Sequence, residues 1–168
     1  YNMKNLFVIM NLAGGALLDI GVDALSIVRS VMTEKPADIV SQWKPSPAGS
    51  DEQAAILLKN KDGQMAAVAL SLHSKQPKRA MISCEKGYIE IMEYPRADRA
   101  KIVDASTGEK KEIACGKTED ALFYEMTDME RAVESGDETE MYLNYTKDVM
   151  DIMTGLRREW GLKYPEEM

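Results

Sequence analysis

Two aspartates one helical turn apart are the residues of this sequence whose type and spacing best suit chemistry. Asp19 and Asp23 lie in the segment Gly14–Asp23 (GGALLDIGVD), which opens an otherwise apolar helical stretch. Residues four positions apart lie on one face of a helix, and two like charges so close are costly unless something pairs with them. Carboxylates can transfer protons when suitably placed. The pair therefore favours a functional site at the start of this helix.

Asp19 also has a purely structural interpretation. Near the start of a helix, a carboxylate is stabilised by the helix dipole and can satisfy local backbone N–H groups. Asp19 alone fits both interpretations equally well. Asp23 shifts the balance toward a site, because capping does not account for a second carboxylate on the same face.

The elements that must position these residues are predicted from hydrophobic periodicity and turn residues. After a lead-in over residues 1–13, apolar residues at three-and-four spacing predict a buried helix from Gly14 to just before Pro36. Short strand-like runs separated by tight turns then predict an antiparallel meander; these are Ile39–Lys44, Gln53–Lys59, Met65–His73, Arg79–Cys84, Tyr88–Met92, Lys101–Ala105 and Lys111–Ala114. Two amphipathic helices follow, with apolar faces over Leu122–Val133 and Tyr145–Trp160.

The predicted fold class is α+β: one open, predominantly antiparallel sheet of six or seven strands, with the three helices on one face. Residues 1–168 are assigned to a single domain. Both faces of Gln53–Lys59 and Met65–His73 are apolar, whereas a sheet with one wet face should alternate. Something must cover the second face. A partner subunit in a homodimer is preferred over other loops or a missing domain.

Composition excludes several classes of function. The 168 residues carry a net charge of −7, which disfavours nucleic acid as a partner, and no apolar run approaches the ~20 residues of a membrane span. Cys84 and Cys115 form no CxxC, and His73 is the only histidine, so zinc and histidine-based triads are not indicated. We expect a cytoplasmic protein. No GxGxxG or P-loop motif is present, and the start at Tyr1 indicates a longer parent.

Several segments together resemble one family. GGALLDIG resembles the signature helix of the glucose–fructose oxidoreductase / inositol dehydrogenase (Gfo/Idh/MocA) family, which includes dihydrodiol dehydrogenases. Ile82–Ile91 (ISCEKGYIEI) resembles its strand–turn–strand, Phe123–Glu125 the opening of its next helix, and Trp160–Pro165 the closing segment of its dihydrodiol-like branch. The resemblance covers nearly the whole chain.

The resemblance implies a function for the parent protein. Members join an N-terminal Rossmann domain, which holds NAD or NADP, to a C-terminal sheet domain whose open face commonly forms the subunit interface. Hydride passes between the nicotinamide and the carbinol carbon of a sugar, polyol or diol. This chain corresponds to the C-terminal domain, so the Rossmann domain is a missing partner. Alone it is expected to bind no cofactor and to be inactive.

Carried over onto this sequence, the family pattern assigns Asp19 to contacts with substrate hydroxyls or to orienting the proton-transfer group. Asp23 occupies the position where the family usually has the acid/base His or Tyr. That departure is consistent with a carboxylate acid/base, altered chemistry or lost activity. Tyr94 and Arg96 are candidate substrate-binding residues, with a solvated loop as the alternative. Glu34-Lys35-Pro36 spells the family's catalytic tripeptide, but it follows the helix instead of preceding it and is interpreted as coincidence.

Two further interpretations stay open beside the dehydrogenase domain. The chain is alternatively a non-catalytic dimerisation or ligand-binding module, which Asp23 favours. The sequence is also compatible with an unrelated domain that has a similar helix. A sheet order other than a meander would support this interpretation.

Overall fold

The computed structural model describes residues 9–165, and its α+β class confirms the prediction. Most of the expected lead-in, residues 1–8, lies outside the described residues. The chain forms two compact units: the first comprises the chain up to Gln76 together with the chain from Asn144, and the second comprises Pro77–Leu143. The assignment of residues 1–168 to a single substrate-binding domain stays a prediction.

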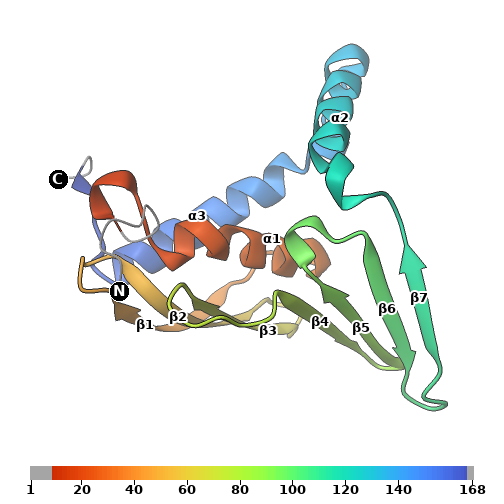
Figure 1. Ribbon diagram of the computed structural model, residues 1–168, viewed down its shortest axis with the longest axis horizontal. Helices are drawn as coiled ribbons and strands as arrows, with labels where there is room; N and C mark the ends of the chain where they lie inside the picture. Colours follow the sequence, from red (N-terminus) through yellow and green to blue (C-terminus); the bar gives the residue numbers. More distant parts are fainter. Residues whose placement is uncertain (1–8, 166–168) are drawn as a thin grey trace. The chain divides into compact units, whose positions relative to one another are not determined.

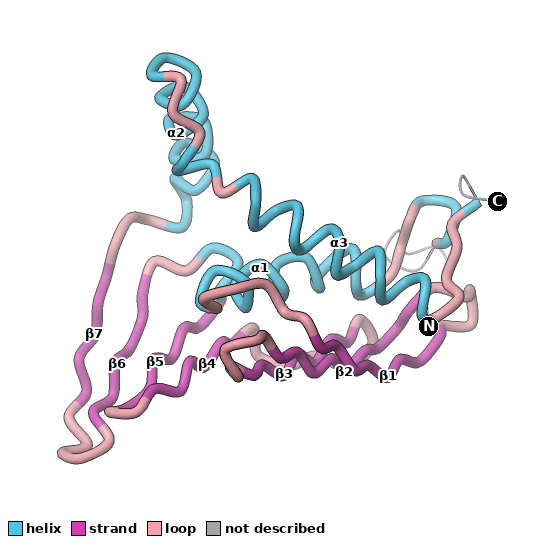
Figure 2. Tube along the Cα trace, turned by 180° about the vertical axis from the view of Figure 1, so that it is seen from behind, coloured by secondary structure: helices cyan, strands magenta, loops and turns pink. Residues whose placement is uncertain are grey.

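The first unit contains a three-stranded antiparallel sheet in the order β1-β2-β3, formed by Asp38–Pro45, Asp51–Lys59 and Met65–Ser71. A π-helix (Leu17–Gly21), α1 (Val22–Val31) and α3 (Leu143–Glu159) lie on one face of it (Figure 1). The strands alternate as a half-covered sheet should: Ala54, Ile56 and Leu58 are buried, whereas Leu57 is 52% exposed. Figure 2 shows the same arrangement from behind.

A buried arginine joins the two long helices of the first unit. The Nε atom of Arg29 on α1 donates to Oδ2 of Asp148 on α3 at 2.8 Å, and its guanidinium lies 4.1 Å from the ring centroid of Tyr145. Directly after α3, the Trp160 ring stacks on Trp43 of β1, and its Nε1–H donates to Ser41 Oγ. These contacts fix α3 against both α1 and the sheet.

The second unit contains a four-stranded antiparallel sheet in the order β4-β5-β6-β7. The strands span Arg79–Cys84, Gly87–Met92, Arg99–Asp104 and Lys110–Ala114. Gly87 must be glycine, because a Cβ there would lie 2.0 Å from the carbonyl oxygen of Val103. The unit also contains α2 (Ala121–Ser135), which ends at Gly136 in the left-handed conformation.

The seven strands form two sheets instead of the single sheet expected. Each sheet is a meander, as predicted, but pairing stops between β3 and β4. The connecting segment, residues 72–78, has no strand structure and contains Pro77, which lacks the N–H group that a ladder needs.

The expectation for α2 was wrong in one respect. Its apolar face was predicted to pack on the sheet, yet its large apolar residues are 48% to 72% exposed, and only Ala132 is buried; the exposed residues are Leu122, Phe123, Met126, Met129 and Val133. Within its unit, the hydrogen bonds at its N-terminal end go to loops: Thr118 Oγ1 donates to Arg96 O, and Lys117 N donates to Tyr124 Oη. Periodicity indicated an amphipathic helix but not its partner.

Candidate functional site

The two predicted catalytic aspartates lie on consecutive turns of one continuous helical segment. Asp19 is exposed within the π-helix, and Asp23 is half-buried in the first turn of α1. Single π-turns inside longer helices occur frequently at functional sites. Gly21 lets this segment approach β3, because a Cβ there would lie 3.0 Å from Leu70 Cδ1. The helix therefore presents Asp19 from an irregular turn that is packed closely on the sheet.

A third carboxylate, which sequence reasoning missed, lies beneath the start of this helix. Asp51 is fully buried, and its Oδ2 accepts a hydrogen bond from the Leu17 N–H at 2.6 Å. Its Oδ1 has no hydrogen-bond partner among the described residues. Burial raises the pKa of Asp51 to about 6, against the opposing effect of N–H groups from Leu17, Asp51 itself and Ala16.

Gly15 fits closely over Asp51. Its φ of +151° is a conformation that L side chains rarely adopt, and a Cβ on it would lie 2.0 Å from Asp51 Oδ1. A glycine at position 15 thus has a physical reason in this structure. Two features of the sequence could have indicated the buried carboxylate: the glycine pair at 14 and 15, and an aspartate, Asp51, at the start of an apolar strand.

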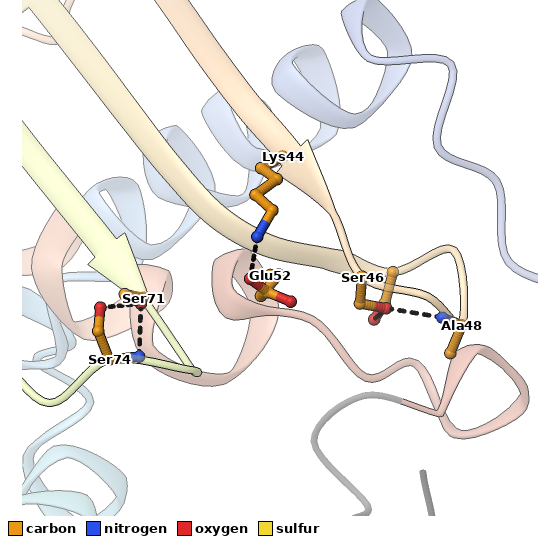
Figure 3. Close-up of polar contacts among 7 residues, drawn as sticks. Lys44, Ser46, Ala48, Glu52, Ser71 and Ser74 are labelled. Carbon is orange, nitrogen blue, oxygen red and sulfur yellow. Dashed lines mark hydrogen bonds and ion pairs between the residues drawn. The ribbon is translucent and has the colours of Figure 1, made fainter. Parts of the chain in front are cut away.

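A β-bulge brings Asp51 to this place. Lys44 pairs with Gln53, but the next pair is Pro45 with Asp51, which leaves Glu52 as an extra residue in β2. Bulges redirect side chains and often lie next to active sites. Glu52 is itself buried and forms an ion pair with Lys44 at 2.8 Å (Figure 3).

Polar side chains gather at the same end of the three-stranded sheet. The ends of β1 and β3 and the start of β2 meet there, and the Ser71 and Ser74 hydroxyls are 2.7 Å apart (Figure 3). An open hollow of about 420 Å³ lies over these strands, on the outer face of the sheet where Ala55 and Ala69 are exposed and not on the face that the helices cover. The polar residues that line it are Gln42, Lys44, Gln53, Ser71, Ser74 and Gln76. Amide, hydroxyl and ammonium groups of this kind can hydrogen-bond a hydroxyl-rich ligand.

Stability should depend on pH through Asp51. Its pKa is about 6 in the folded chain, against 3.8 for a free aspartate side chain, so the folded state binds the proton more tightly. The protonated form stabilises the fold fully below about pH 3.8, and this stabilisation is lost as the pH rises through about 6. We expect wild type to lose up to about 3 kcal/mol relative to Asp51→Asn across this window. Urea unfolding of both proteins at several pH values measures the difference, and parallel pH curves would contradict it.

The other predicted site residues fall elsewhere. Tyr94 and Arg96 form a short 3₁₀ turn in the second unit, where Tyr94 is half-buried and Arg96 is exposed. Their role in substrate binding stays a prediction. Lys35, from the Glu-Lys-Pro tripeptide, lies 3.9 Å from Asp148, beside the Arg29 ion pair. That placement gives it a structural neighbour and agrees with coincidence.

No three His, Cys, Asp or Glu side chains in residues 9–165 are grouped so that they could hold a metal ion. None of the described helices combines the length and apolar character needed to cross a membrane. Cys84 and Cys115 are exposed thiols that form no disulfide with each other.

Comparison with known families gives a match over more than half of the chain. A family model described as the GFO/IDH/MocA C-terminal domain matches residues 4–90. This range includes the helix with Asp19 and Asp23, the whole three-stranded sheet and β4, and it ends within β5. No curated protein matches the sequence significantly.

Solved structures share the fold at low sequence identity. UDP-N-acetylglucosamine 3-dehydrogenase GnnA from Acidithiobacillus ferrooxidans is 16% identical with a TM-score of 0.72, over 83% of this chain and 45% of its own. Aldose-aldose oxidoreductase from Caulobacter crescentus is 18% identical with a TM-score of 0.73, over 95% and 50%. A variant of KijD10, a 3-ketoreductase from Actinomadura kijaniata in complex with TDP-benzene and NADP, is 13% identical with a TM-score of 0.75, over 94% and 50%. The chain thus spans about half the length of these structures.

Proposed function

The chain belongs to the GFO/IDH/MocA family, and on that premise we propose that it is the substrate-binding C-terminal domain of an NAD(P)-dependent oxidoreductase. The reaction is hydride transfer between a nicotinamide and a carbinol carbon of a sugar, polyol or diol. The observation that carries this proposal is the helix with Asp19 and Asp23, set on a π-turn and held over a buried carboxylate. The similar structures include proteins named as a sugar-nucleotide dehydrogenase and an aldose oxidoreductase.

The residues of this chain do not make a nicotinamide site by themselves. No GxGxxG loop is present in the 168 residues, and that loop is what cradles a dinucleotide pyrophosphate at a helix N-terminus. The parent's cofactor, NAD or NADP, therefore requires a Rossmann domain as partner. This chain contributes one wall of the site, where Asp19 hydrogen-bonds substrate hydroxyls and Asp23 takes or gives the hydroxyl proton.

A second candidate function is a non-catalytic dimerisation or ligand-binding module. Two observations favour it: an aspartate stands where the family usually has His or Tyr, and the polar hollow at the sheet end is large enough for a small ligand. Turnover by the full-length protein separates the two candidates. The non-catalytic module would bind a sugar or polyol without reducing or oxidising a nicotinamide.

The test begins with the coding sequence upstream of Tyr1. A further segment of about one domain length, with GxGxxG after its first strand and a later Glu-Lys-Pro, would support the dehydrogenase. The full-length protein is then assayed for absorbance changes of NADH and NADPH with a panel of aldoses, polyols and vicinal diols. Saturable turnover with one class supports the proposal. Cofactor binding without turnover of any class favours the module.

We also propose that the outer face of the three-stranded sheet is a homodimer interface. Within the first unit this face leaves large apolar side chains uncovered: Val40, Leu57 and Met65 are 65%, 52% and 71% exposed. The register places Ala67 beside Leu57, and it places Ala55 and Ala69 in the next row of the same face. Contiguous apolar surface of this kind is typical of interfaces.

Light scattering at micromolar concentration should report a dimer, twice 18.8 kDa for this chain. Leu57→Lys should give monomers, because the interface would bury an unpaired charge. Leu122→Lys, at an equally exposed leucine on α2, is the matched control and should stay dimeric. A monomeric wild-type protein would contradict the proposal. If only Leu122→Lys were monomeric, the interface would lie on α2.

A further inference from the structure

Asp51 is a buried carboxylate to which the proposed reaction gives no role. It is fully buried at the start of β2, and one of its two oxygens has no hydrogen-bond partner among the described residues. A carboxylate in such a place is destabilising unless its contacts compensate. Its carboxylate contacts Gly15, Ala16 and Leu17, which form the first turn of the helix with Asp19 and Asp23.

Two hydrogen bonds link Asp51 to Asp19 through the backbone of that turn. Asp51 Oδ2 accepts from the Leu17 N–H at 2.6 Å, which is short for a bond between an amide and a carboxylate. In the same turn, the Gly15 carbonyl accepts a hydrogen bond from the Asp19 N–H at 3.1 Å. Gly15 itself lies against Asp51 Oδ1 so closely that no Cβ fits between them.

We propose that Asp51 is a positioning residue: its buried carboxylate holds the first helical turn against β2 and thereby fixes the backbone that carries Asp19. The bond to Leu17 occupies Oδ2, so Oδ1 is the oxygen that can take up a proton without breaking the attachment. The ionised carboxylate is the stronger acceptor. The attachment therefore tightens when Asp51 loses its proton, and the position of Asp19 becomes sensitive to pH.

Among the described residues, charged groups near this attachment lie on the strand, on the C-terminal segment and on the helix. On the strand side, the neighbouring Glu52 is paired with Lys44. On the side of the C-terminal segment, the Tyr164 hydroxyl donates to the Gly14 carbonyl at 3.3 Å, and the Arg157 guanidinium lies 5.0 Å from the Tyr164 ring centroid. On the helix, Asp19 is the nearest carboxylate along the chain. None of these charged groups is a cause of the raised pKa of Asp51, which comes from burial.

The test reads the attachment directly, through the Leu17 amide. In the full-length protein with isotope-labelled leucine, the Leu17 amide resonance is identified by its loss in Leu17→Met. We expect it to shift with a midpoint near pH 6 in wild type and to stay constant in Asp51→Asn. A Leu17 amide in wild type that does not titrate near that pH, or one that titrates equally in the variant, overturns the proposal. The wild-type titration decides the matter even if Asp51→Asn folds poorly.

The kinetic consequence rests on the proposed function and is measured separately. Asp51→Asn should lower kcat/KM for the substrate about 10- to 100-fold, mainly through KM, and should remove the pH dependence of KM near 6. The KM for the nicotinamide should not change, because this chain does not hold it. A fully inactive wild type refutes the proposed function but leaves the Leu17 titration as a test of the attachment. An active protein with unchanged KM in Asp51→Asn refutes the positioning role.

Discussion

In the full-length protein, Asp23→Ala should lower the rate of hydride transfer by about 10²- to 10⁴-fold, the range that general acid–base catalysis contributes. Asp23 lies in the first turn of α1 and is half-buried. Its side chain is therefore partly shielded from solvent but still accessible to a ligand. Removing its carboxylate leaves the substrate hydroxyl proton without a protein acceptor. Steady-state kinetics with the substrate found in the panel would measure the loss in kcat.

The matched control for this substitution is Asp151→Ala, which removes an exposed carboxylate from α3 and should leave kcat unchanged. Asp23→His separates a working carboxylate from a decayed site. If Asp23 is the acid/base, the histidine variant should not exceed wild type. If hydride transfer rises in Asp23→His, the site has lost its original residue. An Asp23→Ala protein with wild-type kcat would show that neither description is correct.

Gly15→Ala should be the most destabilising single change to the helix start, lowering the free energy of unfolding by about 3–5 kcal/mol. One part is backbone strain, about 1–3 kcal/mol for a non-glycine residue in such a conformation. The other is displacement of Asp51, whose hydrogen bond to Leu17 involves a charge and contributes about 1.5–3 kcal/mol. The new Cβ would lie 2.0 Å from Asp51 Oδ1, so both residues cannot keep their positions.

Gly63→Ala supplies the comparison. Gly63 has a φ of +82° but open space where its Cβ would lie. Gly63→Ala therefore isolates the strain from the collision, and it should lower the free energy of unfolding by about 1–2 kcal/mol. Urea unfolding can be followed by the fluorescence of Trp43 and Trp160, which stack in the same unit as Gly15. Equal losses for the two variants would mean that Asp51 moves aside freely, and the close fit at Gly15 would have no energetic consequence.

Local patterns were sufficient to predict the elements. The strand Arg79–Cys84 was predicted with its observed bounds, and the other strands were predicted to within about two residues at each end, because alternation and turn glycines depend only on near neighbours. The glycine pair at 14 and 15 correctly marked the start of the buried helix. The resemblance to the family, drawn from the same residues, is confirmed by the matching family model.

The contacts of the site were decided by tertiary structure. Asp51 contacts Leu17, which lies 34 positions earlier in the chain, and a one-residue bulge directs its side chain toward the helix. The local pattern of a strand does not predict a bulge. The division into two sheets likewise depends on which strands find partners, and α2 has an apolar face that periodicity indicates without saying what covers it. The sequence by itself determined the elements and the family, because those follow from neighbouring residues, and it predicted the two aspartates as site residues. Only the tertiary structure revealed the buried carboxylate beneath them, because desolvation and close contact are properties of residues brought together from distant parts of the chain.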